Sequence, residues 1–130
     1  KNPALMPTAI EEFLRAYAPV TMAREVVKET AIKGCTFKPG EMVLLSFPAA
    51  CRDPEMFPDA DKVIIDRKEN RHAAFGLGIH RCIGSNLARM EMTVAVEELL
   101  KRVPDFSVDG KVTWSEGTVR GPRQLPLTFG

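Results

Sequence analysis

The sequence FGLGIHRCIG, residues 75–84, crowds three glycines and a histidine around one cysteine, Cys82, just before a strongly helical segment. This composition predicts a loop that presents a thiolate. At such a turn a sulfur can be surrounded by backbone N–H groups, and it lies at the positive end of the helix that follows, which stabilises negative charge. We therefore expect Cys82 to be able to ligate a metal as a thiolate at neutral pH.

The full pattern, Phe-x-x-Gly-x-His-x-Cys-x-Gly followed by Leu87-Ala88-Arg89, resembles the haem-binding signature of the cytochrome P450 family. The match is specific because it fixes aromatic, glycine and cysteine positions together. The resemblance implies that Cys82 is the catalytic residue and the axial thiolate on the iron of haem b, iron protoporphyrin IX. Such a thiolate pushes electron density toward the metal and favours O–O cleavage.

The same resemblance gives roles to the neighbours of Cys82. Phe75 would pack beside the thiolate, limit water and tune the potential of the iron, although a Phe before a glycine-rich turn can also simply anchor that turn in the core. Gly76 and Gly84 belong to the haem-binding set. Gly78 and Gly84 are best explained by backbone conformations, or by a close approach, that a Cβ would obstruct.

Two cationic or proton-donating side chains, His80 and Arg24, match positions that contact the haem propionates in related soluble bacterial enzymes. Each propionate is an anion that needs donors in a partly dry pocket, so charge complementarity supports this interpretation. The alternative for His80 is a loop histidine bonded to backbone, and the alternative for Arg24 is an exposed charge at a strand edge.

Glu12 and Arg15 lie at i and i+3, adjacent on one helix face. Alone, such a pair is usually a solvated surface pair. The resemblance identifies it with the Glu-x-x-Arg of the family and adds Arg67, which implies a structural Glu12–Arg15–Arg67 network that ties a long loop to the helix. An Arg fork can engage a carboxylate through two bonds, and lysine would not reproduce that geometry.

Four residues would face the substrate by the same resemblance, namely Val20, Thr21, Thr118 and Val119. Small apolar and hydroxyl residues at these positions are equally compatible with ordinary strand packing. Arg81 could lie on the surface where a redox partner docks, but a solvated charge explains it as well.

The composition describes one ordinary domain of 130 residues with 45% hydrophobic content and a net charge of +1. This charge gives no support for nucleic-acid binding. Three cysteines without a short paired spacing argue against a disulfide framework or a zinc ribbon and favour a reducing, cytoplasmic setting. No apolar run approaches the length of about eighteen residues expected of a membrane span.

The hydrophobic spacing predicts an α+β chain with two main helices, at about 4–18 and 85–102. We expect Thr8 and Glu11 to form a capping box, and Glu97 and Lys101 to form an i,i+4 ion pair. Further expectations are short, mostly antiparallel strands near 25–32, 35–38, 42–47 and within 105–130, a short helix at 49–52, and a long meander over 48–72.

The resemblance covers almost the whole chain, from Asn2 to Phe129, and implies that residues 1–130 are a C-terminal fragment, roughly the last third of the mainly helical cytochrome P450 fold. A start at Lys1 and an apolar helix with few partners agree with a C-terminal fragment. The resemblance implies a parent haem-thiolate monooxygenase that inserts one atom of O2 into a small organic substrate, with electrons from a ferredoxin- or flavin-type donor. We expect the isolated fragment to be inactive, and its retention of haem is open.

Two other functions stay open from the sequence. One is a haem-binding sensor or carrier without oxygenase activity. The other is a non-haem metal site that uses Cys82 with His80, His72 or another cysteine. The second is the weaker, since His80 and Cys82 are too close in sequence to form a closed tetrahedral site without distant help.

Overall fold

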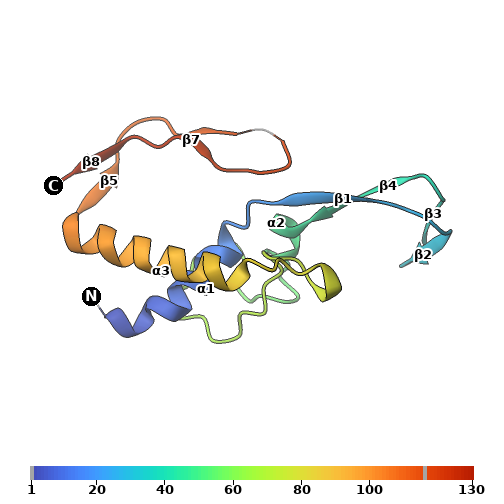
Figure 1. Cartoon of the computed structure of the whole chain (residues 1–130), viewed down its shortest axis with the longest axis horizontal. Coiled ribbons are helices and arrows are strands. Elements are labelled where there is room, and N and C mark those ends of the chain that lie inside the picture. The colour runs from blue at the N-terminus through green and yellow to red at the C-terminus, as the bar shows by residue number, and fades with distance from the viewer. Residues whose placement is uncertain (1, 116) are drawn as a thin grey trace.

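The computed structural model describes residues 2–115 and 117–130. Two helices, α1 and α3, pack against each other near the centre, a long hairpin extends to one side, and the C-terminal strands run along the other side (Figure 1). The α+β class predicted from the sequence is confirmed. The elements are η1 (Pro3–Leu5), α1 (Met6–Ala16), β1 (Thr21–Glu25), β2 (Thr30–Ile32), β3 (Cys35–Phe37), β4 (Met42–Ser46), α2 (Phe47–Ala50), η2 (Gly78–His80), α3 (Ser85–Arg102), β5 (Phe106–Val108), β6 (Thr113–Trp114), β7 (Pro122–Gln124) and β8 (Leu127–Phe129).

The first predicted helix divides into the short 3-10 turn η1 and the α-helix α1. The predicted capping box is wrong. Thr8 lies inside α1, where its hydroxyl donates to the Leu5 carbonyl over 3.0 Å, and Glu11 is occupied elsewhere. The reason is Pro7, which needs no N–H partner in the first turn and so allows the helix to begin before Thr8.

The strands of the N-terminal half form two antiparallel ladders, β1 with β4 and β2 with β3. β3 and β4 match the strands predicted at 35–38 and 42–47. The prediction of one strand over 25–32 is wrong, because β1 starts at Thr21 and pairs there with Ser46. The ladder closes at Val26, whose N–H donates to the Glu41 carbonyl over 2.9 Å, and residues 26–29 connect β1 to the separate β2–β3 hairpin.

The short helix predicted at 49–52 is α2, two residues earlier. Its start is set by Ser46, whose hydroxyl accepts a 3.4 Å hydrogen bond from the Ala49 N–H, with Pro48 in the first turn. The strands predicted within 105–130 are confirmed as the antiparallel pairs β5–β8 and β6–β7. An isolated bridge between Val20 and Val119 joins this C-terminal region to the segment before β1.

Helix α3 has the bounds predicted from its apolar spacing, yet Ser85 is its one buried residue within the described chain. Several of its large apolar side chains are exposed, namely Leu87, Met90, Val94, Leu99 and Leu100. The predicted Glu97–Lys101 pair is wrong. Lys101 instead contacts Glu98 at 2.8 Å, because one Glu98 carboxylate reaches both Lys101 at i+3 and Arg102 at i+4.

One buried cluster lies where the end of α1 meets the meander and the segment that follows the meander. Ala18, Cys51 and Ala74 form a buried cluster, with Leu14 and Ala73 packed against it. This cluster fixes the end of α1 against the residues that lead into the cysteine loop. Among the residues that the structure describes, no helix combines the length and apolar character needed to cross a membrane.

Candidate functional site

A cavity of about 530 Å³ opens beside the cysteine loop, between the end of α1, the β1–β4 ladder and residues 74–82. Its walls are mostly apolar, with one guanidinium, one imidazole and one thiol. The lining residues are Leu14, Pro19, Val20, Met22, Arg24, Leu45, Phe47, Ala74, Phe75, Gly76, Leu77, His80 and Cys82. The cavity thus brings together Cys82, His80, Arg24, Phe75, Gly76 and Val20, which the sequence assigned to one site.

The loop that carries Cys82 is held by its own backbone. The Cys82 N–H donates to the Phe75 carbonyl over 2.8 Å, and the Ser85 N–H donates to the Cys82 carbonyl over 3.3 Å at the start of α3. Gly76 and Gly78 have φ values of +70° and +67°, a region that L side chains rarely adopt. The glycines therefore let the chain turn tightly enough to return Cys82 beside Phe75.

The ring of backbone N–H donors expected around the sulfur is not formed by the described residues, in which Cys82 Sγ accepts no hydrogen bond. The N–H groups of Arg81, Cys82 and Ser85 donate to loop carbonyls instead. Gly84 also differs from the expectation. Its φ is −81°, and a Cβ there would lie 3.8 Å from Cys82 Sγ, an ordinary contact distance. The protein atoms alone thus give no reason for glycine at this position.

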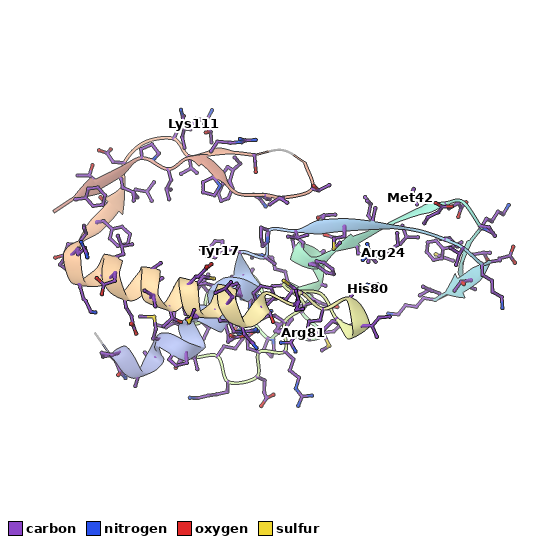
Figure 2. All side chains as sticks on the ribbon, in the orientation of Figure 1. Tyr17, Arg24, Met42, His80, Arg81 and Lys111 are labelled. Carbon is purple, nitrogen blue, oxygen red and sulfur yellow. The ribbon has the colours of Figure 1, made fainter. Side chains whose placement is uncertain are left out.

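Arg24 on β1 and His80 in η2 both line the cavity, and Figure 2 labels both side chains. Both residues are exposed, and the Arg24 guanidinium donates one 2.8 Å bond, to the Ala23 carbonyl. A guanidinium has five N–H donors, so Arg24 keeps capacity to bind an anion. An apolar cavity with a thiol and two such polar groups fits a flat apolar cofactor that carries carboxylates and a metal, as haem does.

The predicted substrate-facing residues divide into two groups. Val20 lines the cavity. Thr21, Thr118 and Val119 are not among its lining residues and take part in strand pairing, where the Thr21 N–H donates to the Thr118 carbonyl over 2.7 Å and Val119 bridges to Val20.

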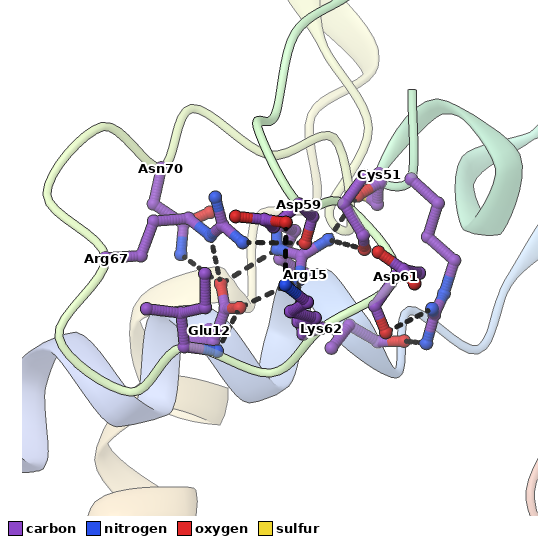
Figure 3. A network of polar contacts seen from close by, with 12 residues as sticks. Glu12, Arg15, Cys51, Asp59, Asp61, Lys62, Arg67 and Asn70 are labelled. Carbon is purple, nitrogen blue, oxygen red and sulfur yellow. Dashed lines mark hydrogen bonds and ion pairs between the residues drawn. The ribbon is translucent and has the colours of Figure 1, made fainter. Parts of the chain in front are cut away.

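A buried ion-pair network joins α1 to the meander (Figure 3). Arg15 donates to both Glu12 oxygens over 2.8 Å, and Arg67 Nε donates to Glu12 Oε2 over 3.1 Å. Other guanidinium N–H groups donate to meander carbonyls, namely those of Cys51, Ala60 and Lys62 from Arg15 and those of Pro58 and Asp59 from Arg67. The Glu12 carboxylate and the two guanidinium groups therefore hold the meander against α1.

The charge of Glu12 is stabilised by this arrangement. Burial favours the neutral acid and raises the pKa of Glu12, but hydrogen bonds from Arg15, the Ile64 N–H and Arg67 outweigh burial and lower the pKa from 4.5 to about 2. Asn70 adds a further donor to Glu12 Oε2 at 3.1 Å. The carboxylate is thus fully ionised at neutral pH without any contact with water.

A second network was not predicted from the sequence. Arg89 on α3 donates to both Glu11 oxygens, over 2.6 and 3.1 Å, and His72 Nε2 lies 3.1 Å from Glu11 Oε2. The Arg89 guanidinium carbon also lies 4.9 Å from the centroid of the Phe75 ring. The Leu87-Ala88-Arg89 motif pointed to Arg89 as a residue of interest. Its partner Glu11 could not be predicted, because the two residues lie 78 positions apart in the sequence.

The non-haem metal alternative finds no support in the described residues. Within 2–115 and 117–130, no three or more His, Cys, Asp or Glu side chains are grouped to hold a metal ion. His72, one of its proposed ligands, contacts Glu11 instead.

The comparisons with known proteins agree on one family. The cytochrome P450 family model matches residues 2–111. The chain is 42% identical to mycinamicin IV hydroxylase/epoxidase of Micromonospora griseorubida and 37% identical to cytochrome P450-terp of Pseudomonas sp, covering 98% of this chain in both cases and 34% and 30% of those proteins. It therefore spans about a third of the length of these relatives.

Solved structures give the same result. P450BioI in complex with an acyl carrier protein ligated to hexadec-9Z-enoic acid superposes with a TM-score of 0.93 at 39% identity, over 99% of this chain and 34% of that one. Cytochrome P450 PksS of Bacillus subtilis 168 has the same TM-score at 38% identity, over 98% and 34%. Because the family model matches residues 2–111 and the superposed P450 structures cover nearly the whole chain, the chain belongs to the cytochrome P450 family.

Proposed function

We propose that the protein carrying this chain is a haem-thiolate monooxygenase that acts on a small organic substrate. The observation that carries the proposal is one cavity lined by a thiol, a guanidinium, an imidazole and apolar walls, contributed by Cys82, Arg24 and His80 among others. When bound, haem b supplies the iron at which O2 is split, so that one oxygen atom enters the substrate and the other leaves as water, with two electrons and two protons consumed.

The residues of this chain hold and shield that cofactor. Cys82 ligates the iron as a thiolate, and the Cys82 N–H bond to Phe75 fixes the sulfur within the loop. Arg24 and His80 bind the propionates, because charge-assisted hydrogen bonds to carboxylates are strong in a partly dry cavity. Phe75 excludes water from the thiolate, and Gly76 and Gly84 allow the cofactor to approach the backbone.

Substrate and electron donor complete the proposal. Val20 faces the substrate from the cavity wall. Thr21, Thr118 and Val119, which adjoin Val20 through the Thr21–Thr118 hydrogen bond and the Val20–Val119 bridge, also face the substrate. A ferredoxin- or flavin-type protein delivers the electrons. Because the chain spans about a third of its relatives, we propose that residues 1–130 alone do not oxygenate a substrate. The cytoplasmic location stays a prediction from the sequence.

The test uses the intact protein with a ferredoxin, its reductase and isotopically heavy O2. The substrates to try are those named with the relatives: mycinamicin IV and hexadec-9Z-enoic acid ligated to an acyl carrier protein. Mass spectrometry is expected to find one heavy oxygen atom in a product, and none with a Cys82→Ala variant. A protein that binds haem but labels no product would favour the sensor or carrier function instead.

A further inference from the structure

The cluster formed by Glu11, His72 and Arg89 joins three segments that are far apart in the sequence. Glu11 lies on α1, Arg89 on α3, and His72 in the segment that leads into the cysteine loop. The guanidinium of Arg89 engages both carboxylate oxygens of Glu11, which fixes the relative orientation of the two helices. The His72 side chain is 2% exposed, whereas the Glu11 side chain is 32% exposed, so their bond is shielded from solvent on the histidine side.

The hydrogen bonds of His72 assign its tautomer. The Ala74 N–H donates to His72 Nδ1 over 3.2 Å, so Nδ1 is the acceptor, and Nε2 carries the proton that is donated to Glu11. Burial lowers the pKa of His72 despite the opposing effect of Glu11, which agrees with a neutral ring. A neutral imidazole thus ties residues 72–74 to α1 through one bond at each nitrogen.

The same cluster reaches both sides of Cys82. On the N-terminal side, the Arg89 guanidinium lies over the Phe75 ring at 4.9 Å, and the Phe75 carbonyl accepts the Cys82 N–H. On the C-terminal side, Arg89 Nη1 donates to the Ser85 carbonyl over 3.3 Å, in the first turn of α3. A single side chain therefore contacts the residues that hold the start and the end of the loop.

We propose that Glu11 and His72 hold Arg89 in place, and that Arg89 positions the Cys82 loop by stacking on Phe75 and bonding to Ser85. These three are positioning residues, since none of them lines the cavity with Cys82. The inference rests on the proposed function where it concerns the iron, because the loop it fixes is the one that ligates haem. It differs from the role of the buried Glu12 network, whose bonds go to the meander and not to the loop.

The geometry also predicts which replacements matter. A lysine at position 89 keeps the charge but has neither the planar face that stacks on Phe75 nor the fork that matches Glu11. Glutamine at position 11 keeps the shape of the side chain but removes the charge that attracts Arg89. The matched control is Glu98→Gln, which breaks two exposed ion pairs on the same helix, with Lys101 and Arg102, without touching the loop.

The first measurement is amide hydrogen exchange at Cys82 in the intact protein. Loss of the stacking and fork contacts is expected to make the Cys82 N–H exchange about tenfold faster in Arg89→Lys and Glu11→Gln. The Glu98→Gln rate should equal the wild-type rate. Unchanged exchange in both cluster variants overturns the inference. If Arg89→Lys does not fold, Phe75→Leu, which keeps apolar bulk but removes the ring, must give the same acceleration, and an unchanged rate there overturns the inference as well.

The second measurement concerns the iron in the haem-loaded protein. The reduced carbon monoxide complex of a thiolate-ligated haem has an unusually red-shifted Soret band, and the fraction with that band should fall in Arg89→Lys and stay at the wild-type level in Glu98→Gln. Equal fractions in both variants contradict the positioning role. A wild-type protein without the red-shifted band contradicts only the proposed function, and the exchange rates at Cys82 still decide on the positioning of the loop.

Discussion

Arg15 donates two parallel hydrogen bonds of 2.8 Å to Glu12, from Nε to Oε2 and from Nη2 to Oε1, and neither side chain is exposed to solvent. The pair lies one turn apart on α1, and the meander folds over it. In water such a pair contributes little, but here the removal of one partner would leave a charge buried without compensation. The stability of the whole α1–meander unit is therefore expected to depend on this contact.

The first prediction concerns Arg15→Lys. Lysine keeps the charge but cannot reproduce the fork or reach the three carbonyls that Arg15 binds. We expect the free energy of unfolding of the intact protein to fall by about 3 kcal/mol, measured by denaturant titration. Arg102→Lys, at an exposed ion pair on α3, is the control and should change stability by less than about 0.5 kcal/mol. Equal effects of the two variants would contradict the structural role.

The second prediction is a pH dependence of stability. The pKa of Glu12 is lower in the folded protein than its ordinary value of 4.5, so its contribution to stability is fully present above that pH and is lost as the pH falls toward about 2. The loss amounts to about 3 kcal/mol. Unfolding free energies measured across this range should converge for wild type and Glu12→Gln at the acid end. A constant difference between the two proteins would show that Glu12 does not titrate in this way.

The third prediction tests the backbone of the cysteine loop. Gly76 has a φ of +70°, and a Cβ there would meet Phe47 at an ordinary 3.6 Å, so the cost of Gly76→Ala comes from the backbone. We expect a loss of about 1–2 kcal/mol in unfolding free energy. Gly121→Ala is the matched control, since Gly121 lacks a positive φ and has no neighbouring atom within 4 Å. Similar stabilities of the two variants would argue against the tight turn.

The fourth prediction addresses haem retention. Replacement of Arg24 or His80 by Gln removes a charged or strong donor to a propionate, and each loss is expected to speed haem dissociation roughly tenfold or more. The rate can be followed by transfer of haem to an excess of apomyoglobin. Arg123→Gln, on the exposed strand β7, removes an arginine outside the cavity and should leave the rate unchanged. Wild-type rates in both cavity variants would remove these residues from the propionate site.

Local patterns in the sequence were sufficient to predict the elements that depend on residues close together in the chain. The apolar spacing along 85–102 predicted the bounds of α3, and the loop glycines predicted the turn around Cys82. The contact between Glu11 and Arg89 could not be predicted, because it joins residues 78 positions apart and depends on how two helices cross. The capping box failed for a local reason, since Thr8 had the right spacing but Pro7 allowed an earlier start.

In the candidate site, too, residues close together in the chain could be predicted as a group, and distant ones could not. Phe75, His80 and Cys82 are close in the chain and therefore share one motif, whereas Arg24 on β1 joins them only through the folded cavity. Its assignment came from the resemblance to a family and not from any spacing. The meander carbonyls that complete the Arg15 site have no sequence signal, because every residue has a carbonyl.

The central claim is that Cys82 ligates haem iron as a thiolate. It is tested most directly by the absorption spectrum of the reduced carbon monoxide complex of the intact protein and of its Cys82→Ala variant, with Cys35→Ala, at an exposed cysteine, as the control. We expect the strongly red-shifted Soret band in the wild-type and Cys35→Ala proteins and its absence from Cys82→Ala. A red-shifted band that survives in Cys82→Ala would contradict it.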